Sequence, residues 1–146
     1  MNLLASVADI MTKNPVTISP DETLTVASEI FDKYNIHHIP VVFEGDLVGM
    51  LSKSDFSLFT TKFSDASFTH VLLDVNLQNY TVKSIMSTGL AKLEAYQRIN
   101  VVLDIFKDNH FHALPVVEGK RVIGIVTTMD IIKHLAQDNE AINSYK

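Results

Sequence analysis

The residue pattern best suited to chemistry is a seven-residue segment that occurs twice. It reads Gly49-Met50-Leu51-Ser52-Lys53-Ser54-Asp55 in the first half of the chain and Gly124-Ile125-Val126-Thr127-Thr128-Met129-Asp130 in the second. Each copy predicts a strand that ends in a hydroxyl residue at a helix start, with a carboxylate three residues later. Free N–H groups and the dipole at a helix start favour a phosphate. A carboxylate can accept hydrogen bonds from two vicinal ribose hydroxyls. The pattern therefore favours a phosphoribosyl ligand.

The same spacing has a second explanation. Ser-x-x-Asp and Thr-x-x-Asp before apolar residues are variants of the capping box, in which the hydroxyl and the carboxylate only satisfy N–H groups at the helix end. In-register repetition, with a glycine before each copy, favours the ligand site. Both explanations stay open at the level of the sequence.

The repetition extends well beyond this motif. A shift of 75 positions aligns Val7–Phe56 with Val82–Ile131 without a gap, and 12 of the 50 pairs are identical. Hydrophobic periodicity within each copy predicts the order β-α-β-β-α after a short helix. The expected elements are short helices at Val7–Met11 and Val82–Met86, brief strands at Val16–Ile18 and Ala91–Leu93, amphipathic helices from Leu24 and from Ile99, strand pairs at His38–Phe43 with Leu47–Leu51 and at Leu114–Val117 with Val122–Val126, and helices after Ser52 and Thr127.

These elements predict an α/β fold (α+β by some schemes) made of two repeats. We expect pseudo-twofold-related units that pack through small sheets with helices outside, because each copy leaves an apolar face that its twin can cover. The junction would then form paired clefts. The expected divisions are repeat 1 at 1–62, a connection at 63–80 with a helical turn around Val71–Leu77, repeat 2 at 81–138 and a frayed tail at 139–146.

Composition narrows the class of protein. The 146 residues include no cysteine, which excludes disulfides, zinc–thiolate sites and cysteine nucleophiles, and favours a reducing cytoplasm. The sequence shows neither a signal peptide nor an apolar stretch long enough to span a membrane. A formal charge of −5 disfavours nucleic acid and anionic lipid as partners.

These motifs together resemble a known family. The doubled Gly-apolar-apolar-Ser/Thr-x-x-Asp pattern, the strands Ile39–Val42 and Leu114–Val117 with their Pro-Val-Val sequences, and the opening Asp9–Thr12 look like a tandem pair of cystathionine β-synthase (CBS) domains. The resemblance covers nearly the whole chain outside the connection and the tail. It implies a non-enzymatic regulatory module that binds AMP, ADP, ATP or S-adenosylmethionine in a cleft, needs no obligatory cofactor, and forms a homodimer.

The resemblance also implies roles for individual positions. Ribose or phosphate is expected at Ser52, Asp55, Thr127 and Asp130, phosphate at His37 and His112, adenine at Thr17, Ile18, Lys92 and Leu93, and further phosphate contacts at His38 and Lys53. The copies differ where Thr17 is replaced by Lys92 and where Met129 is bulky, so equal repeats need not make equal sites.

Two other functions compete with this interpretation. A structural or dimerisation module would have the same repeats and empty clefts. A small hydrolase would act through the histidines, which are densest at His37-His38 and His110-Phe111-His112. No HExxH motif and no helical i, i+4 histidine pair accompanies them, which disfavours a metal site.

Overall fold

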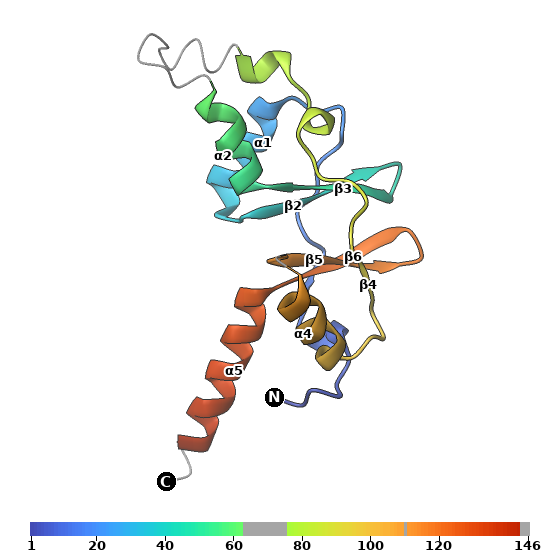
Figure 1. Cartoon of the computed structure of the whole chain (residues 1–146), viewed down its shortest axis with the longest axis vertical. Coiled ribbons are helices and arrows are strands. Elements are labelled where there is room, and N and C mark those ends of the chain that lie inside the picture. Colours follow the sequence, from blue (N-terminus) through green and yellow to red (C-terminus); the bar gives the residue numbers. More distant parts are fainter. Residues whose placement is uncertain (63–75, 110, 144–146) are drawn as a thin grey trace. The chain divides into compact units, whose positions relative to one another are not determined.

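The computed structural model describes residues 1–62, 76–109 and 111–143, and the chain folds into two compact units (Figure 1). Unit 1 combines Met1–Pro15 with Ala91–Lys146, whereas unit 2 is the single segment Val16–Leu90. The two units therefore differ from the two sequence repeats. Each unit contains the opening segment of the opposite repeat.

Unit 2 is built on an antiparallel hairpin of β2 (His38–Phe43) and β3 (Asp46–Ser52). Its turn uses Glu44 and Gly45 at positive φ, 51° and 88°, a conformation for which glycine carries no steric penalty. Helix α1 (Leu24–Tyr34) precedes the hairpin, and α2 (Lys53–Thr61) follows it directly. A 3-10 helix, η2 (Val82–Ser84), returns to the same unit.

The core of unit 2 explains why α1 is amphipathic. Its apolar stripe of Leu24, Ala27 and Phe31 is buried against the inner residues of the hairpin, such as Ile39 and Leu51. Leu77, near the end of the connection, and Val82, just after it, add to this core. Leu24 and Val82 are completely buried, so the returning segment is an integral part of unit 2.

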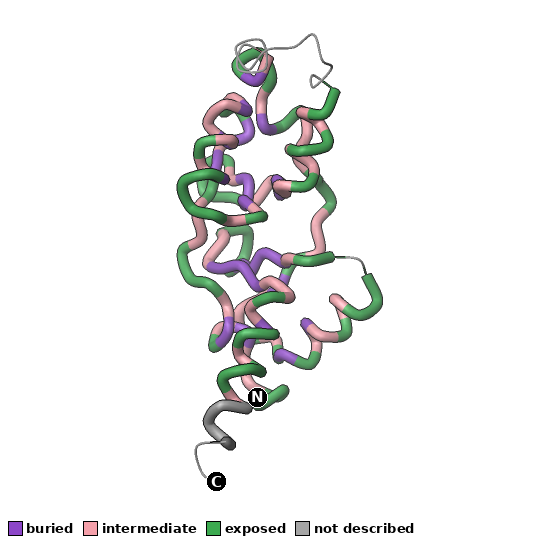
Figure 2. Tube along the Cα trace, turned by 90° about the vertical axis from the view of Figure 1, so that its left-hand side faces the viewer, coloured by how far each residue is buried: buried purple, intermediate pink, exposed green. Residues whose placement is uncertain are grey.

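Unit 1 repeats this plan with a mixed sheet. Strands β5 (Ala113–Glu118) and β6 (Arg121–Thr127) form the hairpin, β4 (Leu93–Glu94) pairs parallel with β5, and β1 (Thr12–Lys13) pairs antiparallel with β6. The helices are η1 (Val7–Asp9), α4 (Ile99–Asp108) and α5 (Thr128–Asn143). Figure 2 shows the chain trace coloured by burial, with both buried and exposed stretches in each unit.

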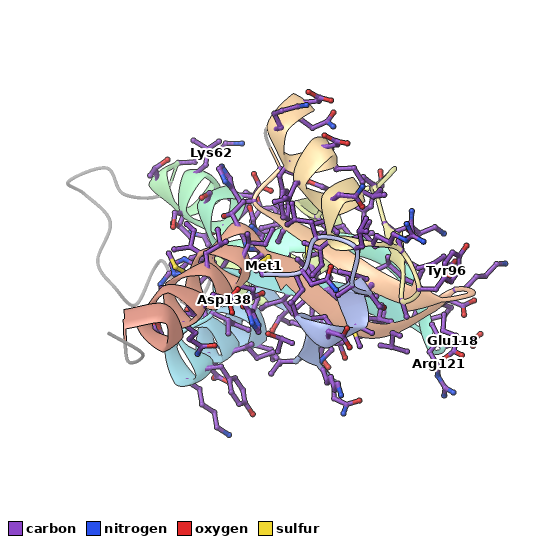
Figure 3. All side chains as sticks on the ribbon, turned by 90° about the horizontal axis from the view of Figure 1, so that it is seen from below. Met1, Lys62, Tyr96, Glu118, Arg121 and Asp138 are labelled. Atoms are coloured by element: carbon purple, nitrogen blue, oxygen red, sulfur yellow. The ribbon has the colours of Figure 1, made fainter. Side chains whose placement is uncertain are left out.

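Several contacts hold the N-terminal segment in unit 1. Val7 is completely buried in the same core as Val102 and Val116. Its N–H donates to the carbonyl of Gln97 at 2.7 Å. The Met1 amino group forms an ion pair with Asp138 on α5 (Figure 3).

The hairpins, the amphipathic helices and the motif helices lie where the sequence predicts them, and the α+β fold class is confirmed. Three smaller expectations were wrong. The strand expected at Val16–Ile18 is reduced to one parallel bridge between Ile18 and Val41. The short helices are 3-10 turns of three residues each, and β1 was not expected at all.

The C-terminal helix also differs from expectation, because α5 continues to Asn143 through much of the segment predicted to fray. Of the helical turn expected around Val71–Leu77, residues 71–75 lie outside the described residues, and 76–79 are helical. None of the helices in the described ranges is long and apolar enough to cross a membrane.

Candidate functional site

The first motif lies at the junction of β3 and α2 in unit 2. Ser52 ends the strand in an extended conformation, and its hydroxyl accepts a hydrogen bond from the Asp55 N–H at 3.0 Å. The hydroxyl therefore acts as a helix N-cap, which satisfies one of the free N–H groups of the first turn. Asp55 lies in that turn with its side chain half-buried.

The carboxylate of Asp55 has no partner among the residues that the structure describes. Among residues 1–62, 76–109 and 111–143, no donor forms a hydrogen bond or ion pair with it. Only half of a capping box is therefore formed in unit 2, by the serine hydroxyl. An acceptor next to a helix N-terminus is left to water or to a ligand.

The second motif, at the junction of β6 and α5 in unit 1, is closed. The Thr127 hydroxyl accepts from the Asp130 N–H at 3.1 Å, and Asp130 Oδ2 accepts from the Thr127 N–H at 2.8 Å. This is the reciprocal capping box that the sequence left open as an alternative. The capping-box explanation is thus met in full in unit 1, and in unit 2 only by the serine hydroxyl.

A backbone hydrogen bond places a histidine beside each motif helix. The Lys53 N–H donates to the His37 carbonyl at 2.8 Å, and the Thr128 N–H donates to the His112 carbonyl at 3.0 Å. The donors are the first helical residues of α2 and α5. Both histidines are exposed, and their backbone carbonyls lie at the helix N-termini.

The remaining phosphate candidates belong to unit 2 alone. His38 begins β2 opposite Ser52 in the antiparallel register, and Lys53 is the first residue of α2. Both side chains are half-buried. At the equivalent positions unit 1 has Ala113 and Thr128, which carry no positive charge.

The adenine-side candidates lie on the other side of the first hairpin strand. Ile18 bridges β2 on the edge away from β3, with its N–H donating to the Pro40 carbonyl at 3.1 Å, and Leu93 pairs with β5 in the same way. The side chains of Ile18 and Leu93 belong to the two cores. Thr17 and Lys92 are exposed, so only these two present side chains to a ligand.

The glycine of each motif has a packing role that the sequence did not indicate. A Cβ on Gly49 would lie 2.6 Å from the Met86 sulfur and 2.9 Å from the Ser87 carbonyl oxygen. At Gly124 the corresponding distances are 2.4 Å to the Met11 sulfur and 3.1 Å to the Thr12 carbonyl oxygen. The lack of a side chain at each glycine therefore leaves room for the segment that crosses its strand, which is Met86–Ser87 at Gly49 and Met11–Thr12 at Gly124. The paired identities Met11/Met86 and Gly49/Gly124 were the available signal.

The described residues show no cluster of metal-ligating side chains. Within the described ranges, no three His, Asp or Glu side chains form a group that could hold a metal ion. His70 and His110 lie outside the described residues.

Comparison with known proteins finds matches to both repeats. The family model of the CBS domain matches residues 7–59 and 82–137. The CBS domain-containing protein YhcV of Bacillus subtilis is 29% identical over 128 residues, which cover 88% of this chain and 84% of YhcV. Protein MJ1225 of Methanocaldococcus jannaschii is 28% identical over 131 residues, and here the match spans 88% of this chain but only 46% of the relative.

A solved structure is similar over almost its entire length. The crystal structure of the CBS domain pair of protein MJ0100, in complex with 5′-methylthioadenosine and S-adenosyl-L-methionine, has a TM-score of 0.77 and 26% sequence identity. The match covers 92% of this chain and 98% of that one. With two family matches in register with the two motifs, the chain belongs to the CBS domain family and contains two copies of the domain.

Proposed function

We propose that this chain is a regulatory module that binds an adenosine-containing ligand, such as AMP, ADP, ATP or S-adenosylmethionine, and that it is not an enzyme. The observation that carries the proposal is the N-terminus of α2, where Ser52 caps the helix and the Asp55 carboxylate has no partner among the described residues. The adenosyl ligands of the similar MJ0100 pair support the ligand class.

The groups at α2 match the parts of such a ligand. Asp55 would accept hydrogen bonds from the two ribose hydroxyls. The helix N-terminus, Lys53 and His37 would face the 5′ substituent, where a phosphate gains from the helix dipole and from charge-assisted hydrogen bonds. Thr17 would border the adenine from across β2.

Regulation requires that the ligand favour one state of the protein over another. A ligand shifts such an equilibrium only by its differential affinity for the two states. We propose that the equilibrium shifted by the ligand is the association of two chains through α5. We also propose that the protein, which has no cysteine, is cytoplasmic.

A ligand panel tests the proposal. At about 100 times the dissociation constant, AMP, ATP or S-adenosylmethionine should add about 2.7 kcal/mol to the free energy of unfolding. We expect the gain in a thermal-shift assay of the wild type and its loss in Asp55→Asn. Asp46→Asn is the matched control, since it removes the same charge from an exposed position at the start of β3 in the same unit. No shift with any of the three ligands at millimolar concentration contradicts the proposal.

A second candidate, a dimerisation module without a ligand, is favoured by the apolar residues exposed on α5. Met129, Ile132 and Leu135 are 53%, 55% and 45% exposed. A dimer whose stability does not change with AMP, ATP or S-adenosylmethionine would favour this function. Nucleotide turnover that is lost in His37→Ala would instead favour a hydrolase.

A further inference from the structure

We infer that unit 1 has an interaction surface for a second copy of this chain, and that this copy docks with the hairpin tip of its unit 2. The two surfaces consist of equivalent residues, related by the shift of 75 positions. The tip surface of unit 1 is Tyr96–Arg98 with Glu118–Arg121, and the tip surface of unit 2 is Asp21–Thr23 with Phe43–Asp46. The inference is independent of the proposed ligand.

The tip surface of unit 1 lies at one end of its sheet. Glu118 and Arg121 pair across the turn of the β5–β6 hairpin. On the other side of β5, Glu94 pairs with Val117 in parallel register, which brings the following Tyr96 beside the turn. Figure 3 shows Tyr96, Glu118 and Arg121 together at this end of unit 1. These residues therefore form one surface.

The aromatic and charged residues of this surface are exposed, and the fold of the unit does not require them. Tyr96 is 78% exposed, more than any other large hydrophobic side chain in the described part of the chain. Arg98 is the N-cap of α4 and forms no side-chain capping hydrogen bond. A cation is unfavourable at this end of a helix, because the dipole is positive there and arginine has no acceptor for the free N–H groups. An exposed aromatic ring near arginine is instead typical of a protein interface.

The two tip surfaces carry opposite charge. In unit 1 the surface has three cations and one carboxylate, whereas in unit 2 it has four carboxylates and no cation. These exposed residues are Arg98, Glu118, Lys120 and Arg121 in unit 1, and Asp21, Glu22, Glu44 and Asp46 in unit 2. Lys83 pairs with Asp21 at 3.3 Å, and no other residue of the two surfaces forms an ion pair within the described ranges. Their charges are therefore available to a partner.

A second copy of the chain supplies both the charge and the apolar area that the unit 1 surface needs. Phe43 is 47% exposed and pairs with Asp46 across the hairpin of unit 2. Its ring can pack on Tyr96 while the carboxylates around it face the cations of unit 1. Complementary charge aligns two surfaces, and aromatic side chains supply the desolvated area. Because the two halves differ, the contact is heterologous.

Two charge-reversed chains test the contact. The first carries Glu44→Lys and Asp46→Lys, which makes both hairpin turns positive, and the second carries Lys120→Glu and Arg121→Glu, which makes both negative. Each chain alone should associate about tenfold more weakly than the wild type. An equimolar mixture should recover the wild-type association, because the positive turns of one chain meet the negative turns of the other. Sedimentation equilibrium of the full chains measures this.

The design separates the contact from other causes of association. The formal charge of −5 becomes −1 in the first chain and −9 in the second, so both stay negative and net charge cannot draw them together. Helix α5 is the same in both, so association through it contributes equally to every sample. Lys33→Glu with Lys62→Glu is the matched control, because it also gives −9 but changes exposed residues at the ends of α1 and α2. It should leave association unchanged.

The variant Tyr96→Ala tests the apolar part of the contact without a change of charge. Association should weaken by about fivefold. The urea midpoint should not change, because the ring is 78% exposed. Tyr34→Ala is the control, since this ring is also exposed but lies at the C-terminal end of α1.

Each outcome decides the inference. Recovery on mixing supports it, since a contact between the two units of one chain would not produce recovery. A mixture that associates no more strongly than the reversed chains alone overturns it, and so does a wild type whose association neither pair of reversals weakens. These measurements use no nucleotide, so failure of the proposed ligand to bind would leave the result intact.

Discussion

Gly49 and Gly124 show that a residue in a ligand-associated motif can be required by packing. Neither has a positive φ, so neither needs the conformational freedom of glycine. What they provide is space, because a methionine and a backbone carbonyl from a crossing segment lie directly against each Cα. The glycine is thus explained without any contact to a ligand.

The two glycines should differ in their tolerance of alanine. In Gly49→Ala the new Cβ meets the Ser87 carbonyl at 2.9 Å, and this backbone atom is fixed by reciprocal hydrogen bonds between Ser87 and Met50 at 2.9 and 3.0 Å. We expect a loss of about 1–3 kcal/mol in the free energy of unfolding. In Gly124→Ala the nearest atom is the sulfur at the flexible end of Met11, and the Thr12 carbonyl oxygen lies farther away, at 3.1 Å, so the loss should be smaller.

Chemical denaturation measures both losses. Shortening the sulfur side chain in the double variant Gly49→Ala/Met86→Ala should not restore stability, since the Ser87 carbonyl remains. A larger loss for Gly124→Ala than for Gly49→Ala would contradict the packing explanation.

At the scale of the element, a helix or strand is predicted well when its pattern of apolar residues repeats over several periods. Helix α1 and the hairpin β2–β3 were predicted from the sequence to within a few residues, because each contains several periods of apolar residues. Strand β1 and the bridge at Ile18 contain one or two residues and have no periodicity to detect. Their pairing depends on partners far away along the chain.

The candidate site was predictable to a similar degree. The sequence identified Ser52 and Asp55 and the histidine that lies beside them. It could not tell which copy closes its capping box, since Ser-x-x-Asp and Thr-x-x-Asp have the same spacing and the choice depends on the carboxylate rotamer. The difference in capping between the two copies therefore became visible only with side-chain positions.

The short helix η1 gives a test of the way the units are assembled. Val7 belongs to the first sequence repeat, yet it is completely buried in the core of unit 1 beside residues of the second. Val7→Ala should therefore cost about 2 kcal/mol and speed amide hydrogen exchange in β5 and β6. Val82→Ala is the matched variant, because its core is that of unit 2. Faster exchange of β2 and β3 in Val7→Ala, with β5 and β6 unchanged, would refute this assignment.

At the scale of the whole molecule, the exposed apolar residues of α5 bear on association. Met129, Ile132 and Leu135 are spaced by three residues and so lie along one side of the helix. A surface of this kind on a helix is typical of a position that another chain covers. We propose that the partner is a second copy, packed about a twofold axis.

A charge placed in this stripe should separate the copies. Ile132→Glu should shift the mass measured by light scattering from that of a dimer to that of a monomer, with little change in the far-UV circular dichroism. Gln137→Glu is the control, since it adds the same charge to an exposed position well away from the stripe. A wild-type monomer at micromolar concentration, or a dimer that survives Ile132→Glu, would contradict this arrangement.

The exchange of opening segments between the repeats has an evolutionary consequence. Because residues 1–15 complete the unit that contains the second repeat, and Val82 completes the other, a single repeat cut from this chain lacks part of its own core. An ancestral chain with one repeat could have filled that gap only with the opening segment of a second molecule. Gene duplication would then have converted a swapped pair of chains into one, and removed the concentration dependence of its folding.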